Sequence, residues 1–385
     1  MNVLEHYASQ LDDLRKQGNL RQFTTNIQMG RDIQINDRSM LNLSSNDYLG
    51  LAVDERLREE FFDLIPISEQ RMSSSSSRLL TGNFPEYEQL EYTLSQLFEN
   101  RSALLFNSGY HMNIGILPAL CDSKTLILAD KLVHASLIDG MRLSTAQYVR
   151  YRHNDLNHLD ALLKKYQADQ TFERIIIVTE SIFSMDGDEA DLAALVALKK
   201  QYSNVMLYVD EAHAIGVRGK QGLGIVEQAA VIQDVDFIVG TFGKALASVG
   251  AYLICDPIIR DFLINKMRPL IFSTAQPPMC MAWSNFILQK VVKMNDQREY
   301  LKALSHSLNT QILAKNYDCP SSSQIVPVIV GDSIQTVALA QEMQEAGFYI
   351  MPVRPPTVPQ GASRLRICLN TRIDQHDLDR LVSLL

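Results

Sequence analysis

The sequence predicts an α/β protein in which a large domain with a mostly parallel sheet precedes a smaller α+β domain. From about residue 104 onward, short uninterrupted apolar runs alternate with stretches of helical periodicity. Uninterrupted apolar runs are typical of strands that are buried on both faces, which is the arrangement in parallel sheets covered by helices. We expect such strands at residues 103–106, 125–128, 174–178, 205–209 and 237–239.

The pattern changes after the proline pair at residues 277–278, and this change predicts the smaller domain. A long helical stretch is expected from about residue 281 to 313. Short strands at residues 325–330 and 365–369 then flank a helix at residues 334–346. Mixed strands and helices of this kind, without a regular alternation, indicate an α+β domain.

The N-terminal residues predict a separate arm. Apolar residues recur at helical spacing from Val3 to Leu14, and the pattern fades at Gly18. The 385 residues exceed the usual size of one hydrophobic core, which is about 250 to 300 residues. We therefore expect an N-terminal arm of helix and short strands over residues 1–45, a large domain over 46–280 and a small domain over 281–385.

Composition and charge exclude several classes of protein. The content of 46% hydrophobic and 21% charged residues is that of an ordinary globular chain and excludes extensive disorder. A formal charge of -8 argues against a nucleic-acid surface, which would need a basic stripe. No apolar stretch is long enough to predict a membrane span, and the first residues do not have the pattern of a secretion signal. We expect a cytoplasmic protein.

The five cysteines predict buried thiols in a reducing compartment. They are odd in number and scattered along the chain. None of their spacings is typical of a metal site or a redox pair, so we expect neither a metal centre nor a disulfide framework.

Lys244 is the residue that says most about which class of reaction the protein could catalyse. It lies in residues 240–246 (GTFGKAL), among small and apolar neighbours. A lysine amine is protonated and inert at its usual pKa, and it attacks an aldehyde only when its surroundings lower that pKa. We interpret Lys244 as a lysine that forms a Schiff base with the aldehyde of pyridoxal phosphate (PLP).

Asp210 is the candidate for the carboxylate that binds the pyridine nitrogen of PLP. It follows the apolar run at residues 205–209, where a carboxylate is costly unless it meets a cation, and the protonated pyridine nitrogen of PLP is such a cation. From these residues alone, an aspartate that caps the next helix is an equally good interpretation. A nucleotide-binding role is a third, although the chain contains no upstream Gly-rich loop that ends in Lys-Ser or Lys-Thr.

Two histidines complete a candidate cofactor site. His213 could form a hydrogen bond to the phenolic oxygen of PLP, and His134 could lie flat against the pyridine ring. Each histidine, taken alone, fits a structural interior residue better.

Small and hydroxylated residues offer a place for the cofactor phosphate. Ser108, Gly109 and Tyr110 follow a predicted strand and can present backbone N–H groups at a helix N-terminus. Thr241 and the Ser273-Thr274 pair add hydroxyl groups, which could instead cap helices. Since ligands of open α/β sheets bind beyond the carboxyl ends of the strands, we expect these loops to meet at one edge.

The C-terminal region contains two cationic segments, Arg354 to Pro359 (RPPTVP) and Arg364 to Arg366 (RLR). An arginine can bind a substrate carboxylate through two parallel hydrogen bonds. The alternative is a proline-stiffened surface loop with solvated arginines, which the local pattern favours when it is read alone.

Taken in order, these motifs resemble the PLP-dependent α-oxoamine synthases of fold type I. The resemblance covers essentially the whole chain, and its motifs are residues 43–50 (LSSNDYLG), 183–188 (FSMDGD), 209–213 (VDEAH) and 241–244 (TFGK). The family condenses an amino acid with an acyl thioester. The resemblance implies a PLP-dependent transferase whose large domain has a mostly parallel seven-stranded sheet, together with a smaller C-terminal α+β domain.

The resemblance also assigns roles to individual residues. It implies Lys244 as the Schiff-base lysine, Asp210 at the pyridine nitrogen, and His134 stacked on the ring. Further cofactor contacts are implied for Gly109, Tyr110, Ser184, His213, Thr241 and Thr274, the last from the partner subunit of a homodimer with shared active sites. Substrate contacts are implied for Arg21, Asn46, His134, Arg354, Thr357 and Arg366.

Within the family, residues 354–359 most resemble the biotin-pathway member. That resemblance implies L-alanine and a pimeloyl thioester as substrates, with coenzyme A or acyl carrier protein as the thiol carrier. Glycine C-acetyltransferase, 5-aminolevulinate synthase and serine palmitoyltransferase are the alternatives within the family. A non-catalytic binding protein of the same fold is the alternative from another class. The chain departs from the family pattern at Ser73 to Arg78, which replaces a glycine-rich run, and at Tyr87, where a histidine is expected.

Overall fold

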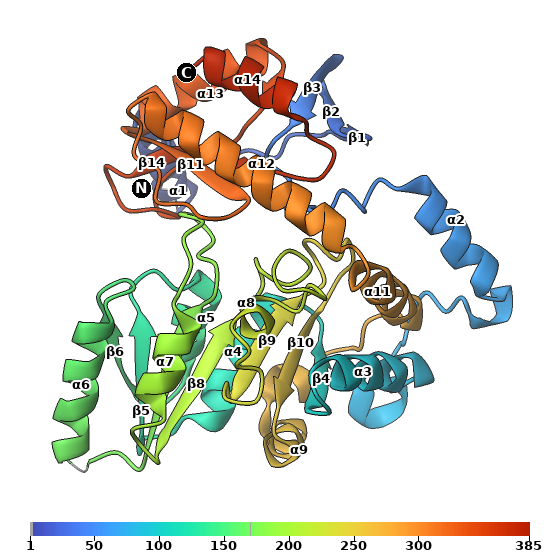
Figure 1. The fold of residues 1–385 in the computed structure, drawn as a ribbon, viewed down its shortest axis with the longest axis vertical. Helices are drawn as coiled ribbons and strands as arrows, with labels where there is room; N and C mark the ends of the chain where they lie inside the picture. Colours follow the sequence, from blue (N-terminus) through green and yellow to red (C-terminus); the bar gives the residue numbers. More distant parts are fainter. Residues whose placement is uncertain (1–2, 170) are drawn as a thin grey trace. The chain divides into compact units, whose positions relative to one another are not determined.

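A computed structural model describes residues 3–169 and 171–385, which form two compact units. The terminal unit contains Met1–Asp54, Ser184–Asp188 and Glu299–Leu385, and the central unit contains Glu55–Phe183 and Glu189–Arg298. Figure 1 shows their helices and strands. The domain boundaries expected after residues 45 and 280 stay a prediction. Residues 1 and 2 of the expected arm lie outside the described residues.

The central unit is built on a seven-stranded sheet. Its strand order is β4-β10-β9-β8-β7-β5-β6, and only β10 runs antiparallel to its neighbours. The strands are β4 (Ser102–Phe106), β5 (Thr125–Asp130), β6 (Gln147–Tyr151), β7 (Arg174–Glu180), β8 (Val205–Asp210), β9 (Phe237–Thr241) and β10 (Ala251–Cys255). The mostly parallel sheet is therefore confirmed, and all five predicted strands are present.

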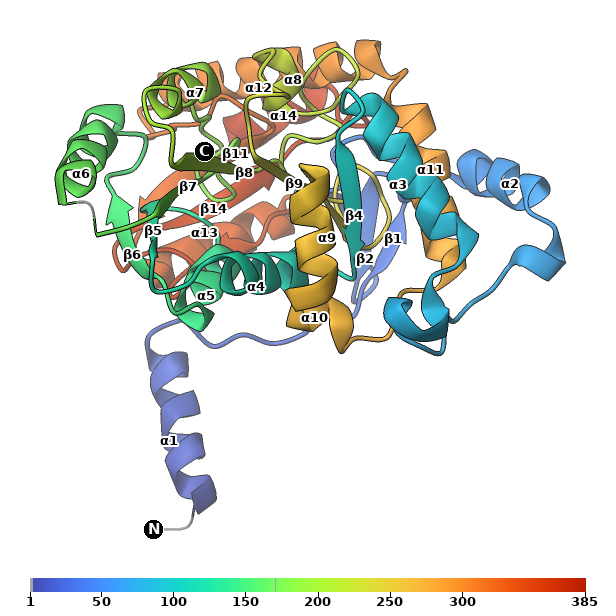
Figure 2. The same cartoon turned by 90° about the horizontal axis from the view of Figure 1, so that it is seen from below.

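Helices cover both faces of this sheet, which explains why its strands are apolar throughout. Figure 2 shows α4 (Gly109–Leu120) and α5 (Ala135–Leu143) on one face, and α7 (Leu192–Lys199) and α8 (Ile225–Gln228) on the other. The first face buries a continuous apolar cluster that joins these two helices to the strands. The other helices of the unit are α2 (Glu55–Leu64), α3 (Pro85–Leu97), α6 (Leu156–Asp169), α9 (Pro257–Lys266), α10 (Arg268–Ile271) and α11 (Pro278–Val291), with a 3-10 turn at Ile67–Glu69 and a π-helical turn at Arg78–Gly82.

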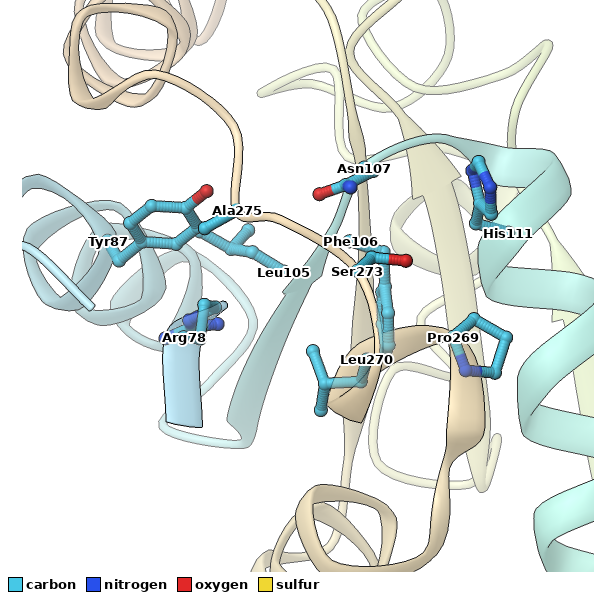
Figure 3. Close-up of a pocket in the computed structure, with 10 residues that line it drawn as sticks. All are labelled: Arg78, Tyr87, Leu105, Phe106, Asn107, His111, Pro269, Leu270, Ser273 and Ala275. Atoms are coloured by element: carbon cyan, nitrogen blue, oxygen red, sulfur yellow. The ribbon is translucent and has the colours of Figure 1, made fainter. Parts of the chain in front are cut away.

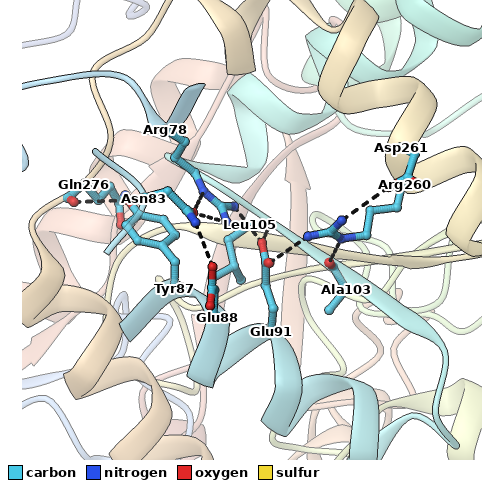
Figure 4. A network of polar contacts seen from close by, with 10 residues as sticks. All are labelled: Arg78, Asn83, Tyr87, Glu88, Glu91, Ala103, Leu105, Arg260, Asp261 and Gln276. Carbon is cyan, nitrogen blue, oxygen red and sulfur yellow. Dashed lines mark hydrogen bonds and ion pairs between the residues drawn. The ribbon is translucent and has the colours of Figure 1, made fainter. Parts of the chain in front are cut away.

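A buried carboxylate fixes the π-helical turn at Arg78–Gly82, as Figure 4 shows. Glu91 on α3 pairs with Arg78 at 2.6 Å and with Arg260 at 3.2 Å, and it accepts a hydrogen bond from the Leu105 N–H. The Arg78 guanidinium also lies 4.4 Å from the ring centre of Tyr87. Tyr87, where the family pattern has a histidine, thus takes part in holding this turn.

The terminal unit contains two small sheets. One has the order β1-β2-β3-β12 and the other β11-β14-β13. The strands are β1 (Ile27–Met29), β2 (Asp32–Ile35), β3 (Arg38–Asn42), β11 (Ile325–Gly331), β12 (Phe348–Tyr349), β13 (Pro352–Val353) and β14 (Ser363–Cys368). The helices are α1 (Val3–Lys16), α13 (Ser333–Glu345) and α14 (Gln375–Ser383), and α12 (Asn295–Ala314) runs into this unit from residue 295. The predicted arm helix, the two strands and the helix between them are confirmed.

One expectation about the helices is wrong. The long helical stretch predicted from about residue 281 to 313 is not continuous: it consists of two helices, α11 and α12, which are separated at residues 292–294. Arg298 donates a hydrogen bond to the Val291 carbonyl at 2.7 Å, so a side chain satisfies a carbonyl group at the end of α11. None of the helices in the described part of the chain has the length and apolar character needed to cross a membrane.

Candidate active site

The loops that carry the candidate residues of the central unit leave the same edge of the sheet. Strands β5, β7, β8 and β9 all run in the same direction. Strand β4 shares this direction, because β10 is antiparallel to both β4 and β9. The carboxyl ends of these strands lead to Gly109, His134, Asp210 and Lys244. The convergence expected from the sequence is confirmed for these loops.

Lys244 pairs with His213. The Lys244 Nζ lies 2.7 Å from the His213 Nε2, and the histidine is only 4% exposed. The lysine is half-buried in the turn that follows the carboxyl end of β9. The structure therefore brings the predicted nucleophile and one of the two predicted histidines into direct contact.

Asp210 ends β8 and is 6% exposed. One carboxylate oxygen, Oδ1, accepts a hydrogen bond from the Ala212 N–H at 2.9 Å, and the other, Oδ2, accepts one from the Asn113 Nδ2 at 2.9 Å. Over residues 3–169 and 171–385, no lysine or arginine forms an ion pair with this carboxylate. Because a nearly buried carboxylate is costly without a cation, the geometry leaves Asp210 suited to a cationic ligand.

His134 lies near both Asp210 and Lys244. Burial lowers the pKa of its imidazole, the Asp210 carboxylate opposes that shift, and the Lys244 amine adds to it. The lowered pKa favours the neutral ring at neutral pH, which is the form that suits a residue lying against an aromatic cofactor. Lys244, His213, His134 and Asp210 therefore form one cluster in the central unit.

The N-terminus of α4 is the candidate phosphate site. The Ser108 hydroxyl caps the helix by accepting a hydrogen bond from the His111 N–H at 3.2 Å. The first N–H groups of a helix, here Gly109 and Tyr110, have no acceptor within the helix and are available to an anion. A Cβ atom at Gly109 would lie 3.9 Å from the Thr241 Cβ, so these two candidates are neighbours.

The side chain of Tyr110 is engaged elsewhere. Its hydroxyl donates to the Asp139 Oδ2 at 2.7 Å, and this hydrogen bond raises the pKa of the phenol. The Thr241 hydroxyl donates to the Gly250 carbonyl at 2.9 Å and accepts from the Gly243 N–H at 3.1 Å. For Tyr110, then, the backbone N–H is the group that remains for a phosphate.

The backbone of Thr274 contacts the segment that precedes α4. Asn107 donates a hydrogen bond to the Thr274 carbonyl at 2.8 Å, and the Thr274 side chain is exposed. Figure 3 shows the adjoining pocket, in which Ser273 faces Asn107 and His111. Its volume of about 10 Å³ suits a single water molecule rather than a cofactor.

Three candidates of the terminal unit lie together: Arg366 and its two hydrogen-bond partners, Asn46 and Ser184. Arg366 on β14 donates from Nε to the Ser184 carbonyl at 2.6 Å and from Nη1 to the Asn46 Oδ1 at 3.1 Å. Burial lowers the pKa of its guanidinium, but Cys368 and Tyr48 outweigh that effect and leave the pKa raised. The structure thus brings Arg366, Asn46 and Ser184 together and keeps the arginine charged.

A second group in the terminal unit joins the remaining candidates. Arg21 donates to the carbonyl groups of Arg354 and Pro355, at 3.2 and 3.0 Å, and to the Thr357 hydroxyl at 3.3 Å. Arg354 donates to the Gly18 carbonyl. Burial and the nearby Arg21 lower the pKa of Arg354. The loop lies at the surface, as the local pattern favoured, but its arginine is not simply solvated, because Arg354 donates to a backbone carbonyl group.

Two buried residues of the central unit were missed by reasoning from sequence. Asn113 contacts Asp210 directly and is 2% exposed. Glu211, fully buried, accepts hydrogen bonds from the Ser181 hydroxyl at 2.5 Å and from the Val226 N–H at 2.7 Å. A polar residue inside the apolar α4 segment and a second acidic residue after a buried strand were the available signals.

The residues of the central unit fit PLP. They offer a lysine beside a histidine, a nearly buried carboxylate without a lysine or arginine partner in the described ranges, and N–H groups at a helix N-terminus. These groups match the aldehyde, the pyridine nitrogen and the phosphate of PLP, respectively. In contrast, no group of three or more His, Cys, Asp and Glu side chains in residues 3–169 and 171–385 is arranged to hold a metal ion.

Comparison with known proteins gives a consistent result. The family model for aminotransferase class I and II matches residues 38–385. A protein of Pasteurella multocida (strain Pm70), which carries 8-amino-7-oxononanoate synthase as a provisional name, is 54% identical over 384 residues. That alignment covers 100% of this chain and 99% of the relative.

Two solved structures share the fold. Serine palmitoyltransferase of Sphingomonas wittichii aligns with a TM-score of 0.89 at 29% identity, covering 99% of this chain and 95% of that one. The 8-amino-7-oxononanoate synthase of Francisella tularensis aligns with a TM-score of 0.75 at 26% identity, covering 90% and 96%. The chain therefore belongs to the aminotransferase class I and II family of fold type I enzymes, and within it to the 8-amino-7-oxononanoate synthases.

Proposed function

We propose that this chain is a PLP-dependent acyltransferase of biotin biosynthesis. It condenses L-alanine with a pimeloyl thioester and releases carbon dioxide and the free thiol carrier, with 8-amino-7-oxononanoate as the product. The observation that carries the proposal is the cluster of Lys244, His213, His134 and Asp210 at one edge of the central sheet. The identity of 54% to a relative with that name supports the choice of substrates.

The residues of this cluster have separate tasks. When bound, PLP supplies an electron sink that stabilises negative charge at the α-carbon of the amino acid. Asp210 would hold a proton at the pyridine nitrogen, and His134 would pack against the ring. Lys244 would hold the cofactor through Nζ, and its free amine would serve as the general base that removes the α-proton of alanine. The close contact with His213 gives the Lys244 amine a partner with which to share that proton.

The other candidates hold the ends of the cofactor and the substrates. The N–H groups of Gly109 and Tyr110 are proposed to bind the phosphate, together with the Thr241 hydroxyl, which would turn its proton from the Gly250 carbonyl to the phosphate. Ser184 and His213 are proposed to bind the phenolic oxygen. Arg366 is proposed to bind the alanine carboxylate, since its planar guanidinium can form two parallel hydrogen bonds to a carboxylate.

A further set of residues is assigned to the thioester and to alanine. We infer that Arg21, Asn46, Arg354 and Thr357 contact the substrates. The hydrogen bonds that join Arg21 to residues 354–357 support a common role for these residues.

We further infer a homodimer that works in the cytoplasm. Exposed apolar side chains gather near the π-helical turn, where Leu80 is 80% exposed and Phe272 is 71% exposed. The Ala275 N–H donates to the Ser76 carbonyl at 2.9 Å, which keeps the two segments together. An apolar patch of this kind is typical of a protein interface, and it would place Thr274 within reach of a second subunit. All five cysteines are free thiols, which supports a reducing compartment.

The proposed reaction is tested by a matrix of substrates. PLP-loaded protein is mixed with L-alanine, glycine or L-serine, each with pimeloyl-, acetyl- or palmitoyl-coenzyme A, and with pimeloyl-acyl carrier protein. Free thiol and carbon dioxide are measured. The proposal expects release only for alanine with a pimeloyl thioester. A preference for glycine with acetyl-coenzyme A would make the chain a glycine C-acetyltransferase, and no release with any pair would favour a non-catalytic binding protein.

A further inference from the structure

A chain of buried hydrogen bonds runs behind the candidate cofactor site in the central unit. Its centre is Asn113, a 2% exposed side chain on α4. The Asn113 Nδ2 lies 2.9 Å from the Asp210 Oδ2 and 2.9 Å from the Ser136 Oγ, and the Asn113 Oδ1 lies 2.6 Å from the Tyr208 hydroxyl. The amide therefore contacts two elements through three buried hydrogen bonds: β8, at Tyr208 and Asp210, and α5, at Ser136.

Counting donors and acceptors fixes the direction of every bond in this chain. An ionised carboxylate only accepts hydrogen bonds, so the Asn113 Nδ2 must face Asp210, and its second N–H donates to the Ser136 Oγ. The Asn113 Oδ1 consequently faces Tyr208, whose hydroxyl can only act as the donor at this contact. The carboxylate of Asp210 thus determines which way round the amide of Asn113 sits, and the Tyr208 hydroxyl holds the amide in that orientation by donating to its oxygen.

The same assignment of donors and acceptors can be extended to His134. Because the Ser136 Oγ accepts from Asn113, its own proton is available to the His134 Nδ1, which lies 2.8 Å away. The Ser136 N–H donates to the same nitrogen at 3.2 Å. The His134 Nδ1 is therefore an acceptor, and the neutral ring carries its proton on Nε2. One amide thus connects the carboxylate assigned to the pyridine nitrogen with the histidine assigned to the ring face.

We propose that Asn113 is a positioning residue that fixes the orientation of Asp210 for the cofactor, and that Tyr208 fixes Asn113 in turn. This inference rests on the proposed function, since it concerns the same site. Both oxygens of Asp210 already have a donor, from Asn113 and from Ala212, so the carboxylate cannot rotate without losing a buried hydrogen bond. The remaining lone pairs are then held in a fixed direction before a cofactor binds.

Binding of PLP to the full-length protein tests this arrangement without any measurement of turnover. Tyr208→Phe removes only the hydroxyl that donates to Asn113, and Asn113→Leu removes the contact to Asp210 while keeping the branched shape of the side chain. We expect the Kd for PLP to rise about 3- to 10-fold in Tyr208→Phe. In Asn113→Leu we expect a rise of about 10- to 100-fold. The absorption spectrum of bound PLP should change in the same direction as in Asp210→Asn.

Tyr252→Phe is the matched control. Tyr252 is a fully buried tyrosine of the same sheet, and its hydroxyl has no hydrogen-bond partner within the described residues. The same atom is removed from the same kind of surroundings, so the Kd for PLP should stay within about twofold of the wild-type value. Unfolding of each PLP-free variant in urea reports its stability separately from its affinity for PLP.

A double-mutant cycle separates positioning from general damage. If Asn113 and Tyr208 act through Asp210, neither substitution should raise the Kd further in an Asp210→Ala background. The same fold-increase in both backgrounds would overturn the proposal, and so would equal effects of Tyr208→Phe and Tyr252→Phe. A wild-type protein that binds no PLP would instead overturn the proposed function, and this inference with it.

Discussion

The Lys244 Nζ and the His213 Nε2 lie 2.7 Å apart, within one hydrogen bond of each other. Since His213 is 4% exposed, its imidazole is held in place, and it restricts where the lysine amine can lie. At this distance the two nitrogens form one hydrogen bond, and the nitrogen that carries the proton is the donor. The pair therefore keeps the amine at the edge of the sheet and next to a group that can exchange its proton.

The first prediction concerns Lys244 itself. Lys244→Ala should bind PLP without a covalent bond and should lose turnover, because no other amine replaces the nucleophile. Borohydride reduction of the PLP-loaded protein, followed by peptide mass spectrometry, should find the cofactor on the Lys244 peptide of the wild type only. Lys266→Ala, which removes an exposed lysine on α9, is the control and should behave as wild type. Turnover by Lys244→Ala at the wild-type rate would refute the assignment.

Arg366 should act on alanine and not on PLP. Arg366→Met keeps an unbranched apolar side chain and removes the charge and all the guanidinium donors, so we expect the KM for alanine to rise by about 10- to 100-fold. The Kd for PLP should be unchanged. Arg366→Lys retains the charge without the planar fork and should fall between the two. Equal KM values for Arg366→Met and the wild type would remove the proposed role.

Glu211 should make stability depend on pH. Burial raises the pKa of this carboxyl from 4.5 to about 7, although hydrogen bonds from Ser181, Val226 and Ile225 oppose the shift. Between these two pH values the folded protein holds a proton that the unfolded chain releases. The stabilisation is therefore fully present below pH 4.5 and is lost as the pH rises through about 7. The loss is on the order of 3 kcal/mol.

Urea unfolding of the PLP-free protein at several pH values checks this prediction. Glu211→Gln cannot titrate and should lack this part of the pH dependence, so the difference in unfolding free energy between wild type and variant should change between pH 5 and pH 8. Substitutions near this side chain are restricted as well, since a Cβ atom at Gly224 would lie 2.5 Å from its Oε2. Glu59→Gln, at an exposed glutamate on α2, is the control. Parallel pH curves for Glu211→Gln and the wild type would contradict the prediction.

Leu80 should lie in a subunit interface. It is 80% exposed, so Leu80→Glu should cost the fold little and should convert a dimer into monomers by placing a charge in an apolar contact. Sedimentation of wild type and variant measures the change. Leu313→Glu, which changes a 49% exposed leucine on α12, should leave the mass unchanged. A monomeric wild type would contradict the proposed assembly.

Five strands of the central sheet were predicted because their signal is local, whereas β10 was not predicted although all its residues are buried. Strands such as β5 and β8 have apolar side chains on both faces, and each ends where a polar motif begins. The edge strand β6 was not predicted, because most of its residues are at least partly exposed and give no continuous apolar run. The break between α11 and α12 was missed for a different reason. It contains neither glycine nor proline, and the arginine that satisfies the end of α11 lies several residues further along.

The candidate site was predictable where a residue carries its own chemical signature. Lys244 and Asp210 stand in short motifs after buried strands, and the shared direction of those strands brings their loops to one edge. Asn113 could not be found in this way, since its role depends on contacts with Tyr208 and Asp210, nearly a hundred residues away. The grouping of Arg21 with Thr357 likewise depends on long-range packing that has no local pattern.

The central claim, decarboxylative condensation, is tested most directly by the fate of the alanine carbons. Two parallel reactions contain PLP-loaded protein and pimeloyl thioester, one with alanine labelled at the carboxyl carbon and one with alanine labelled at the methyl carbon. We predict that the carboxyl label leaves as carbon dioxide, in equal amount to the thiol released, and that the methyl label stays in the condensed product. Retention of the carboxyl label in pyruvate, without release of thiol, would show amino-group transfer instead and would contradict the account.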